Sequence, residues 1–342
     1  KCISLRIELM RIPPFLVKGD SISLAAPSFG AASEPYLTRM NASLANLRKL
    51  GFNPVVGPNV FRGDGIAGSA SPKERAVEIN EAFASSSKAV FSVGGGETMV
   101  EILPYVDFES ISKLPPKFFM GYSDNTNLTF LLPTLCDTAS VYGPNAASFY
   151  ALPLRCAEKD AMELMEGKRE FLGYPKYSIS QNNPSAPLRR YSLTQRKIIE
   201  PVQYDGPFQG TLLGGCLDCL VTLCGTRFDK VKEFAAAHPE GIIWFLESCD
   251  LNAISIRRAL FQLKEAGWFD HANGFLIGRP LHPEECFGTT ARESYLSLLS
   301  EFGKPILYNV DLGHVPPSLP LLCGAEAEIS MVEDNFRIHY LY

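Results

Sequence analysis

The sequence lacks any apolar stretch of the roughly 20 residues that a membrane-spanning helix needs. Its first eleven residues mix charged with apolar side chains, unlike the unbroken apolar segment of a secretory signal peptide. It also has no long run of Lys or Arg, and the formal net charge is -5. Because binding to a phosphate backbone relies on a basic surface, we expect a cytoplasmic protein that binds neither membranes nor nucleic acid.

The nine cysteines do not follow the pattern of a disulfide framework or a zinc site. They are an odd number spread through a large chain, which is typical of unpaired thiols in a reducing compartment. Cys216 and Cys219 have the spacing of a redox or metal-binding pair, but no second pair and no nearby histidine completes a zinc site. We interpret them as thiols packed in an apolar helix, with a redox pair as the alternative. The sequence thus predicts neither a metal nor a cofactor.

The length and composition indicate a folded protein of about two domains. The chain has 342 residues, 46% hydrophobic and 20% charged, so each half can bury its own core. From about residue 20, short β-like runs alternate with helical patterns, which favours parallel βαβ units. The expected strands are 21–26, 54–56, 89–93 and 117–120, and the expected helices begin near 36, 71, 97 and 125. Residues 1–150 are therefore predicted to form a Rossmann-like, doubly wound α/β domain with a parallel sheet.

The second half shows a similar but less regular pattern. Residues 151–205 have little periodicity and are interpreted as a connector with a surface loop. Apolar segments then resume, with strands expected at 241–246 and 274–278 and an amphipathic helix between them at 254–266. Residues 206–342 are predicted to form a smaller mixed α/β domain.

Ser123 lies between a predicted strand and a predicted helix, in the sequence Met-Gly-Tyr-Ser-Asp. A tight turn there would project the hydroxyl from the carboxyl edge of the sheet and free backbone N–H groups for an oxyanion, as in a nucleophile elbow. Gly121 and Ser123 match the start of Gly-x-Ser-x-Gly, but Asn125 replaces its last glycine. The segment alone equally allows Ser123 or Asp124 to serve only as a helix cap.

Three consecutive glycines, residues 94–96, follow the previous predicted strand. Because parallel strands end at one edge of a sheet, this loop should lie near Ser123. Glycines allow close backbone approach and a helix N-terminus favours negative charge, so the loop suits an oxyanion or a carboxylate. A phosphate loop is the alternative, although the usual glycine motifs are absent and Glu97 would repel phosphate.

Two more titratable residues follow predicted strands in the second half. Glu247 ends an apolar strand, so it needs a cation or a hydrogen-bond donor, either in a catalytic site or in a structural salt bridge. His314 precedes Pro316 and Pro317, which stiffen its loop. Such a loop suits an imidazole held between an acid and a hydroxyl, although a lone loop histidine often has no function.

Taken in order, these motifs resemble the LD-carboxypeptidase family of serine peptidases, which includes the microcin C self-immunity proteins. The resemblance covers nearly the whole chain from about residue 20. It is carried by Gly94-Gly95, residues 121–124, residues 210–215, residues 245–247 and Gly313-His314. It implies a Ser-Glu-His triad in a cleft between the Rossmann-like domain and the C-terminal domain, and a homodimer.

The resemblance also implies a role for five residues. Ser123 corresponds to the nucleophile, Glu247 to the orienting carboxylate and His314 to the general base. The oxyanion would be held by the backbone N–H groups of Gly95 and Asp124. The implied reaction is attack on an amide carbonyl followed by hydrolysis of an acyl-enzyme, without a metal ion.

Two substrate classes follow from the resemblance. LD-carboxypeptidases remove a terminal D-alanine from murein tetrapeptides, whereas the immunity-type members cut an amide in peptidyl or aminoacyl nucleotides, whose base is held by aromatic side chains. The long connector is closer to the immunity-type branch, but Trp244 and Trp268 lie outside it. The tyrosines available to stack on a base are Tyr174, Tyr177, Tyr191 and Tyr204. We predict a murein peptide carboxypeptidase, with the nucleotide hydrolase as the alternative.

The sequence departs from the family pattern at two places. Gly96 and Glu97 stand where many relatives carry an aromatic and a small or amide residue, and Cys216 stands where many carry asparagine. Neither departure touches the predicted triad, so both concern specificity. A non-catalytic protein that uses the same cleft to hold a ligand is the alternative from another class.

Overall fold

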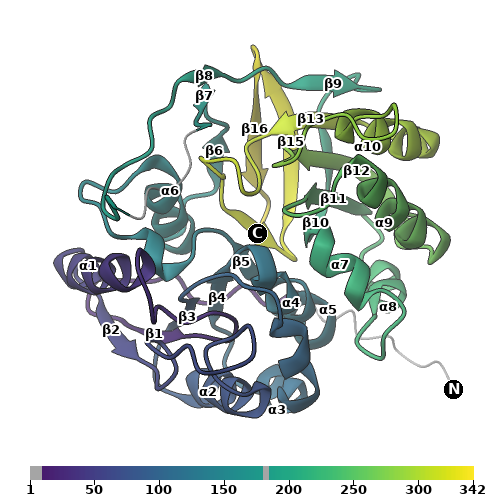
Figure 1. The fold of residues 1–342 in the computed structure, drawn as a ribbon. Helices are drawn as coiled ribbons and strands as arrows, with labels where there is room; N and C mark the ends of the chain where they lie inside the picture. Colours follow the sequence, from purple (N-terminus) through teal and green to yellow (C-terminus); the bar gives the residue numbers. More distant parts are fainter. Residues whose placement is uncertain (1–9, 180–184) are drawn as a thin grey trace, which may run out of the picture.

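The computed structural model describes residues 10–179 and 185–342, which form two main sheets, one centred on each half of the chain (Figure 1). The first sheet contains β1 (Ser21–Ala25), β2 (Asn53–Val56), β3 (Ala89–Ser92), β4 (Phe118–Gly121), β5 (Ser140–Tyr142) and β14 (Leu321–Cys323). Its strand order is β14-β5-β4-β3-β1-β2, with β1 to β5 parallel. In this doubly wound order the sequence of strands reverses between β1 and β3. A crevice is expected there, at the carboxyl ends of the strands.

The helices of the first half cover both faces of this sheet (Figure 1). They are α1 (Tyr36–Lys49), α2 (Pro72–Ala84), α3 (Phe108–Lys113), α4 (Thr126–Thr129) and α5 (Leu131–Cys136), with the 3-10 helices η1 (Met99–Tyr105), η2 (Ser123–Asn125) and η3 (Ala146–Ser148). The predicted start of α2 is confirmed, because Ser71 and Glu74 form a capping box and Pro72 is the first helical residue.

Two predicted helices of the first half were wrong in form. The helix expected from about Glu97 is the 3-10 helix η1, which contains Pro104; proline has no N–H to donate and disfavours an α-helix interior. The helix expected at 125–135 is split into η2, α4 and α5, because Pro133 has no N–H to donate to the Thr129 carbonyl and so interrupts the hydrogen bonds at Phe130.

The second sheet has eight strands and a parallel centre. Its strands are β6 (Glu170–Leu172), β9 (Glu200–Val202), β10 (Phe208–Cys216), β11 (Ile242–Glu247), β12 (Ala272–Gly278), β13 (Ile306–Val310), β15 (Glu326–Val332) and β16 (Asn335–Tyr340). Strands β10 to β13 are parallel neighbours, and antiparallel strands flank them on both sides. Helices α7 (Leu217–Leu223), α8 (Val231–Ala237), α9 (Ala253–Glu265) and α10 (Ala291–Leu299) and the 3-10 helix η4 (Ser300–Phe302) belong to this half.

The segment predicted as a connector contains regular structure. It holds α6 (Cys156–Met165), the edge strands β6 and β9, and a small pairing of β7 (Lys176–Tyr177) with β8 (Gln195–Arg196). Residues 180–184 of the predicted surface loop, and residues 1–9, lie outside the described residues. The domain limits given above stay predictions, since a C-terminal strand, β14, joins the first sheet by pairing with β5.

The predicted fold class, a Rossmann-like parallel sheet with a second mixed α/β domain, is confirmed. The two halves share a large apolar core, in which Phe130 of the first half stacks on Trp268 of the second at 5.1 Å between ring centroids, and the first half has a second, smaller core of its own. Within residues 10–179 and 185–342, no helix combines the length and apolar character needed to cross a membrane.

Candidate active site

Ser123 follows β4 and has a backbone conformation that few non-glycine residues adopt. Its φ is +64°, in the left-handed region where the Cβ atom crowds the backbone. The residue begins η2, and neither its side chain nor that of Asp124 caps the helix. The strain is instead associated with a strand-to-helix turn that presents the hydroxyl at the carboxyl edge of the sheet, the geometry of a nucleophile elbow.

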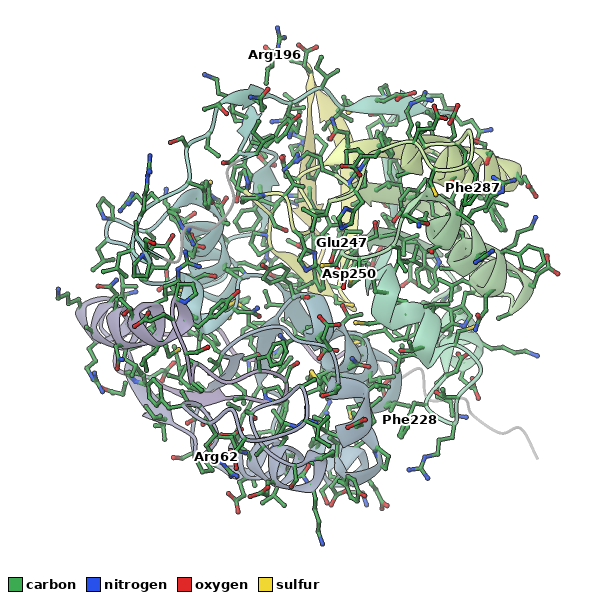
Figure 2. The ribbon with its side chains drawn as sticks, in the orientation of Figure 1. Arg62, Arg196, Phe228, Glu247, Asp250 and Phe287 are labelled. Atoms are coloured by element: carbon green, nitrogen blue, oxygen red, sulfur yellow. The ribbon has the colours of Figure 1, made fainter. Side chains whose placement is uncertain are left out.

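The Ser123 hydroxyl contacts an imidazole from the other half of the chain. Ser123 Oγ lies 2.9 Å from His314 Nε2, and His314 Nδ1 lies 2.9 Å from Glu247 Oε2. Glu247 ends β11 and is fully buried, and Figure 2 shows it near the middle of the molecule, between the two halves. The three side chains form one hydrogen-bonded relay without any movement of the two halves.

The loop before His314 fits closely around Glu247. Gly313 has a φ of +101°, and a Cβ atom there would lie 2.5 Å from Glu247 Oε2. Any larger residue would push the carboxylate away from the imidazole. The His314 ring packs against Tyr122, with 5.1 Å between ring centroids, so the imidazole is held from its face as well as from its two nitrogens.

Tyr142 connects the ends of the relay and was missed by sequence reasoning. Its hydroxyl donates to Glu247 Oε1 at 2.5 Å and accepts the Ser123 backbone N–H at 3.3 Å. Glu247 is therefore held by a histidine and a tyrosine rather than by the lysine or arginine that a structural salt bridge requires. The only sequence signal for Tyr142 was its place at the end of β5, next to β4.

The glycine loop after β3 lies against the Ser123 side chain. A Cβ atom at Gly95 would lie 3.1 Å from both Cβ and Oγ of Ser123, so only glycine leaves space for a substrate carbonyl there. The loop is held by two hydrogen bonds: Asn125 Nδ2 donates to the Gly94 carbonyl at 2.9 Å, and the Phe29 N–H donates to the Gly95 carbonyl at 3.0 Å.

The Asp124 carboxylate is turned away from the relay and holds the surrounding backbone. It accepts hydrogen bonds from the Ser28 hydroxyl, the Met99 N–H and Asn127 Nδ2. The predicted role of Asp124 as an oxyanion donor depends on its backbone N–H instead. As the second residue of η2, it belongs to the first turn, whose N–H groups lack helical partners.

A cavity of about 1540 Å³ opens beside the relay and is lined by Gly95, Ser123 and His314. It collects the loops after β1, β3, β4 and β5 from the first half and the loops after β12 and β13 from the second. The arginines in its lining are Arg39, Arg155, Arg189, Arg190 and Arg279, and the carboxylates in the described part of the lining are Glu97 and Glu158. Arg155 pairs with Glu158 and Arg279 with Asp311. The other three arginines outnumber Glu97 in the lining, which favours an acidic ligand.

The electrostatics of the relay favour an ion pair between His314 and Glu247. Burial disfavours the imidazolium, but the Glu247 carboxylate, together with Cys249 and Tyr122, outweighs it and holds the pKa of His314 well above its usual value. Burial also opposes ionisation of Glu247, and His314, together with hydrogen bonds from Tyr142 and Cys216, overcomes it, so the pKa of Glu247 is lowered. Each partner stabilises the charged form of the other.

The thiols of Cys216 and Cys219 lie behind Ser123, at the start of α7. A hydrogen bond with Cys219 and burial raise the pKa of the Cys216 thiol, and its Sγ lies 3.3 Å from Asp218 Oδ2. A raised thiol pKa lowers the thiolate fraction and hence the reactivity. The structure thus places both cysteines as packed thiols.

The tyrosines proposed to stack on a base divide into two groups. Tyr177 and Tyr191 line the cavity. Tyr174 is buried against Asp160, with 2.6 Å between the hydroxyl and the carboxylate, and Tyr204 binds the Met331 backbone. Only the first two are therefore placed to meet a ligand.

Family models match both halves of the chain. The LD-carboxypeptidase N-terminal domain matches residues 22–143, and the LD-carboxypeptidase C-terminal domain matches residues 209–329. A curated relative from Bacillus subtilis, named probable murein peptide carboxypeptidase, is 28% identical over 94% of this chain and 92% of its own length. The microcin C7 self-immunity protein MccF of Escherichia coli is 25% identical over 96% of this chain and 95% of its own.

Solved structures share the fold. The crystal structure of an MccF-like protein from Bacillus anthracis superposes with a TM-score of 0.82, covering 97% of this chain and 100% of that one at 23% identity. At this identity the likeness concerns the arrangement of the elements.

Proposed function

Since the chain belongs to the LD-carboxypeptidase family, we propose that it is a serine carboxypeptidase that hydrolyses a small peptide amide. In this proposal Ser123 is the nucleophile, His314 the general base and Glu247 the carboxylate that orients it. The observation that carries the proposal is the relay of two 2.9 Å contacts from Ser123 Oγ through His314 to Glu247 Oε2. A positioned base within hydrogen-bond reach of a strained serine is the arrangement that nucleophilic catalysis requires.

The proposed reaction begins when His314 Nε2 takes the proton of the Ser123 hydroxyl. The oxygen attacks the substrate carbonyl, and the imidazolium formed is stabilised by Glu247 through Nδ1. His314 then donates the proton to the leaving amine. Water attacks the resulting acyl-enzyme by the same steps and frees Ser123.

The oxyanion is proposed to bind the backbone N–H groups of Gly95 and Asp124. These groups belong to two loops that the Asn125 and Asp124 side chains hold in fixed positions. Donors that are fixed before the reaction stabilise the developing charge without reorganising, and losing one typically lowers kcat by about 10² to 10³.

Murein peptides are the proposed substrates. A murein tetrapeptide carries several carboxylates, and the cavity lining is rich in arginine. The Bacillus subtilis relative named for murein peptides is similar over 94% of the chain.

An immunity-type hydrolase of peptidyl or aminoacyl nucleotides is the second candidate. One observation favours it: Tyr177 and Tyr191 line a cavity that is large enough for a nucleotide, and tyrosine rings can stack on a base. The relative MccF, named for self-immunity to microcin C7, is similar over 96% of the chain.

Parallel incubation with a murein tetrapeptide and a microcin C analogue is expected to separate the two candidates. We expect release of D-alanine from the tetrapeptide, with a kcat/KM at least about 10²-fold above that for the nucleotide analogue. Mass spectrometry of the products measures both reactions. Cleavage of the nucleotide alone would transfer the assignment to the second candidate, and cleavage of neither would contradict hydrolysis of these classes.

The pH dependence should report the state of His314. The base must be neutral to accept the Ser123 proton, and its pKa is raised because the Glu247 carboxylate stabilises the imidazolium. Activity is therefore expected to fall as the pH drops through a midpoint above about 6.5, the ordinary histidine value. The profile of kcat/KM against pH measures this midpoint. A midpoint at or below 6.5 would contradict the proposed ion pair.

The cytoplasmic location and the homodimer stay predictions. In the described part of the chain eight cysteines are free thiols, which supports a reducing compartment.

A further inference from the structure

A second group of buried charges lies next to the His314 loop. Arg279 follows β12 and Asp311 follows β13, and these strands are parallel neighbours with Gly278 paired to Val310. Arg279 Nη1 donates to Asp311 Oδ1 at 2.8 Å, and Lys197 Nζ pairs with Oδ2 of the same carboxylate. All three side chains are at least 96% buried. One buried anion thus holds two cations.

The two cations have different second contacts. Arg279 Nη2 donates to the carbonyls of Val315 at 3.2 Å and Pro317 at 3.0 Å. Lys197 Nζ instead donates to Asn335 Oδ1 at 2.6 Å, on β16 and away from the loop. Only Arg279 therefore bridges Asp311 to the backbone on the far side of His314.

Arg279 and Asp311 together close the segment that carries the base. Asp311 precedes His314 by three residues, and the Asp311 carbonyl accepts the Leu319 N–H at 2.8 Å. The guanidinium lies inside this closed loop and stacks on the Tyr177 ring at 4.8 Å. A planar guanidinium can donate in two directions at fixed angles, which a lysine ammonium at the same place cannot reproduce.

From this arrangement we infer that Arg279 is a positioning residue, which fixes the His314 loop by joining the Asp311 carboxylate to the carbonyls of Val315 and Pro317. The inference rests on the proposed function, because it gives His314 the role of base. Arg279 acts through the loop rather than on the reacting atoms. A displacement of about 1 Å at a catalytic group can lower the rate by about 10²-fold.

Two methionine variants form a matched pair that tests the inference. Arg279→Met and Lys197→Met each remove one buried cation from Asp311, but only the first frees the carbonyls beside His314. We expect Arg279→Met to lower kcat by about 10²-fold with a smaller change in KM. Lys197→Met should keep kcat within about threefold of the wild type. Equal losses in both variants would show that the cluster serves stability alone and would overturn the inference.

Arg279→Lys provides a second variant that retains the charge. This variant is expected to fold but to lose activity. A lysine ammonium cannot reach the Asp311 carboxylate and both loop carbonyls at the same time. Full activity in Arg279→Lys would show that charge suffices and would overturn the inference. Thermal unfolding of all three variants separates lost stability from lost positioning, and this lysine variant decides the question if Arg279→Met does not fold.

The acid limb of the pH profile distinguishes positioning from charge. The titratable groups that face His314 are Glu247 and Cys249 from β11 and its loop, Tyr122 after β4, and Glu97 at longer range. If loosening the loop weakens the contact with Glu247, the pKa of His314 falls and the limb moves to lower pH in Arg279→Met. Loss of a nearby positive charge alone would move the limb to higher pH. A shift of the acid limb to higher pH in Arg279→Met would therefore contradict positioning.

A measurement without substrate separates this inference from the proposed function. The proton shared by His314 Nδ1 and Glu247 gives a low-field NMR signal that requires the ordered pair. We expect the signal in the wild type and in Lys197→Met and its loss or broadening in Arg279→Met. An unchanged signal in Arg279→Met would refute the inference even in an active enzyme. If the wild type shows no turnover, the proposed function is contradicted. The NMR signal then still tests whether Arg279 orders the pair of His314 and Glu247.

Discussion

Replacing Ser123 with alanine is expected to lower hydrolysis by about 10⁶-fold while the protein stays folded. The hydroxyl lies 2.9 Å from His314 Nε2. The Cys249 thiol also contacts His314, but burial raises its pKa, so it is a poor replacement for the hydroxyl. The oxyanion donors and the cavity remain, and they account for the residual rate over water. Product formation measured by mass spectrometry, with trapping of the acyl-enzyme on the wild type, checks this result.

Two control variants accompany the alanine variant. Ser297→Ala, on the exposed face of α10, should retain full activity. Ser123→Gly should be as inactive as Ser123→Ala but more stable than the wild type by about 1 kcal/mol, because glycine adopts a φ of +64° without strain. Undiminished hydrolysis by Ser123→Ala on a substrate that the wild type cleaves would refute the nucleophile.

Replacing Glu247 with glutamine is expected to lower kcat by about 10⁴-fold. The carboxylate accepts one hydrogen bond from His314 and another from Tyr142, but an amide offers one acceptor and one donor. If the amide oxygen faces Tyr142, the NH₂ group donates to His314 Nδ1. The imidazole then carries its proton on Nε2, toward Ser123, and cannot act as a base.

Tyr142→Phe is the matched control for the glutamine variant. It removes the other hydrogen bond to Glu247 but leaves the carboxylate as an acceptor for His314, so the tautomer is kept. We expect a loss of about 10- to 100-fold in kcat, in keeping with one hydrogen bond to a charged group. Steady-state kinetics of both variants, with unfolding curves as the stability check, make the comparison. Equal losses in the two variants would contradict a role for Glu247 in setting the tautomer.

The sequence was sufficient to place Ser123 beside the glycine loop. Both follow parallel strands, and such strands end at one edge of a sheet whatever their side chains are. The sequence pattern could not predict that Glu247 and His314 lie next to Ser123, because their approach depends on how the two sheets pack against each other. Their expected roles came from the resemblance to a family and not from local pattern.

Other features of the site lay beyond sequence patterns. Tyr142 acts through a hydroxyl that crosses from one half to the other, and its strand has only three residues. Arg279 and Asp311 each follow a strand, and their pairing depends on the register of β12 with β13. The Phe130 ring, in the predicted helix, stacks on Trp268 from the second half. Tertiary contacts decided all three features.

The strand β14 also bears on how the chain folds during synthesis. Its residues 321–323 pair with β5, so the edge of the first sheet is completed by residues made after the parallel strands of the second sheet. The first half therefore emerges from the ribosome with β5 unpaired on one side, an exposed edge that could pair wrongly. The pairing of this strand also ties the order of assembly to activity, because it completes the sheet that carries Ser123 only after the loop that carries His314 has been made.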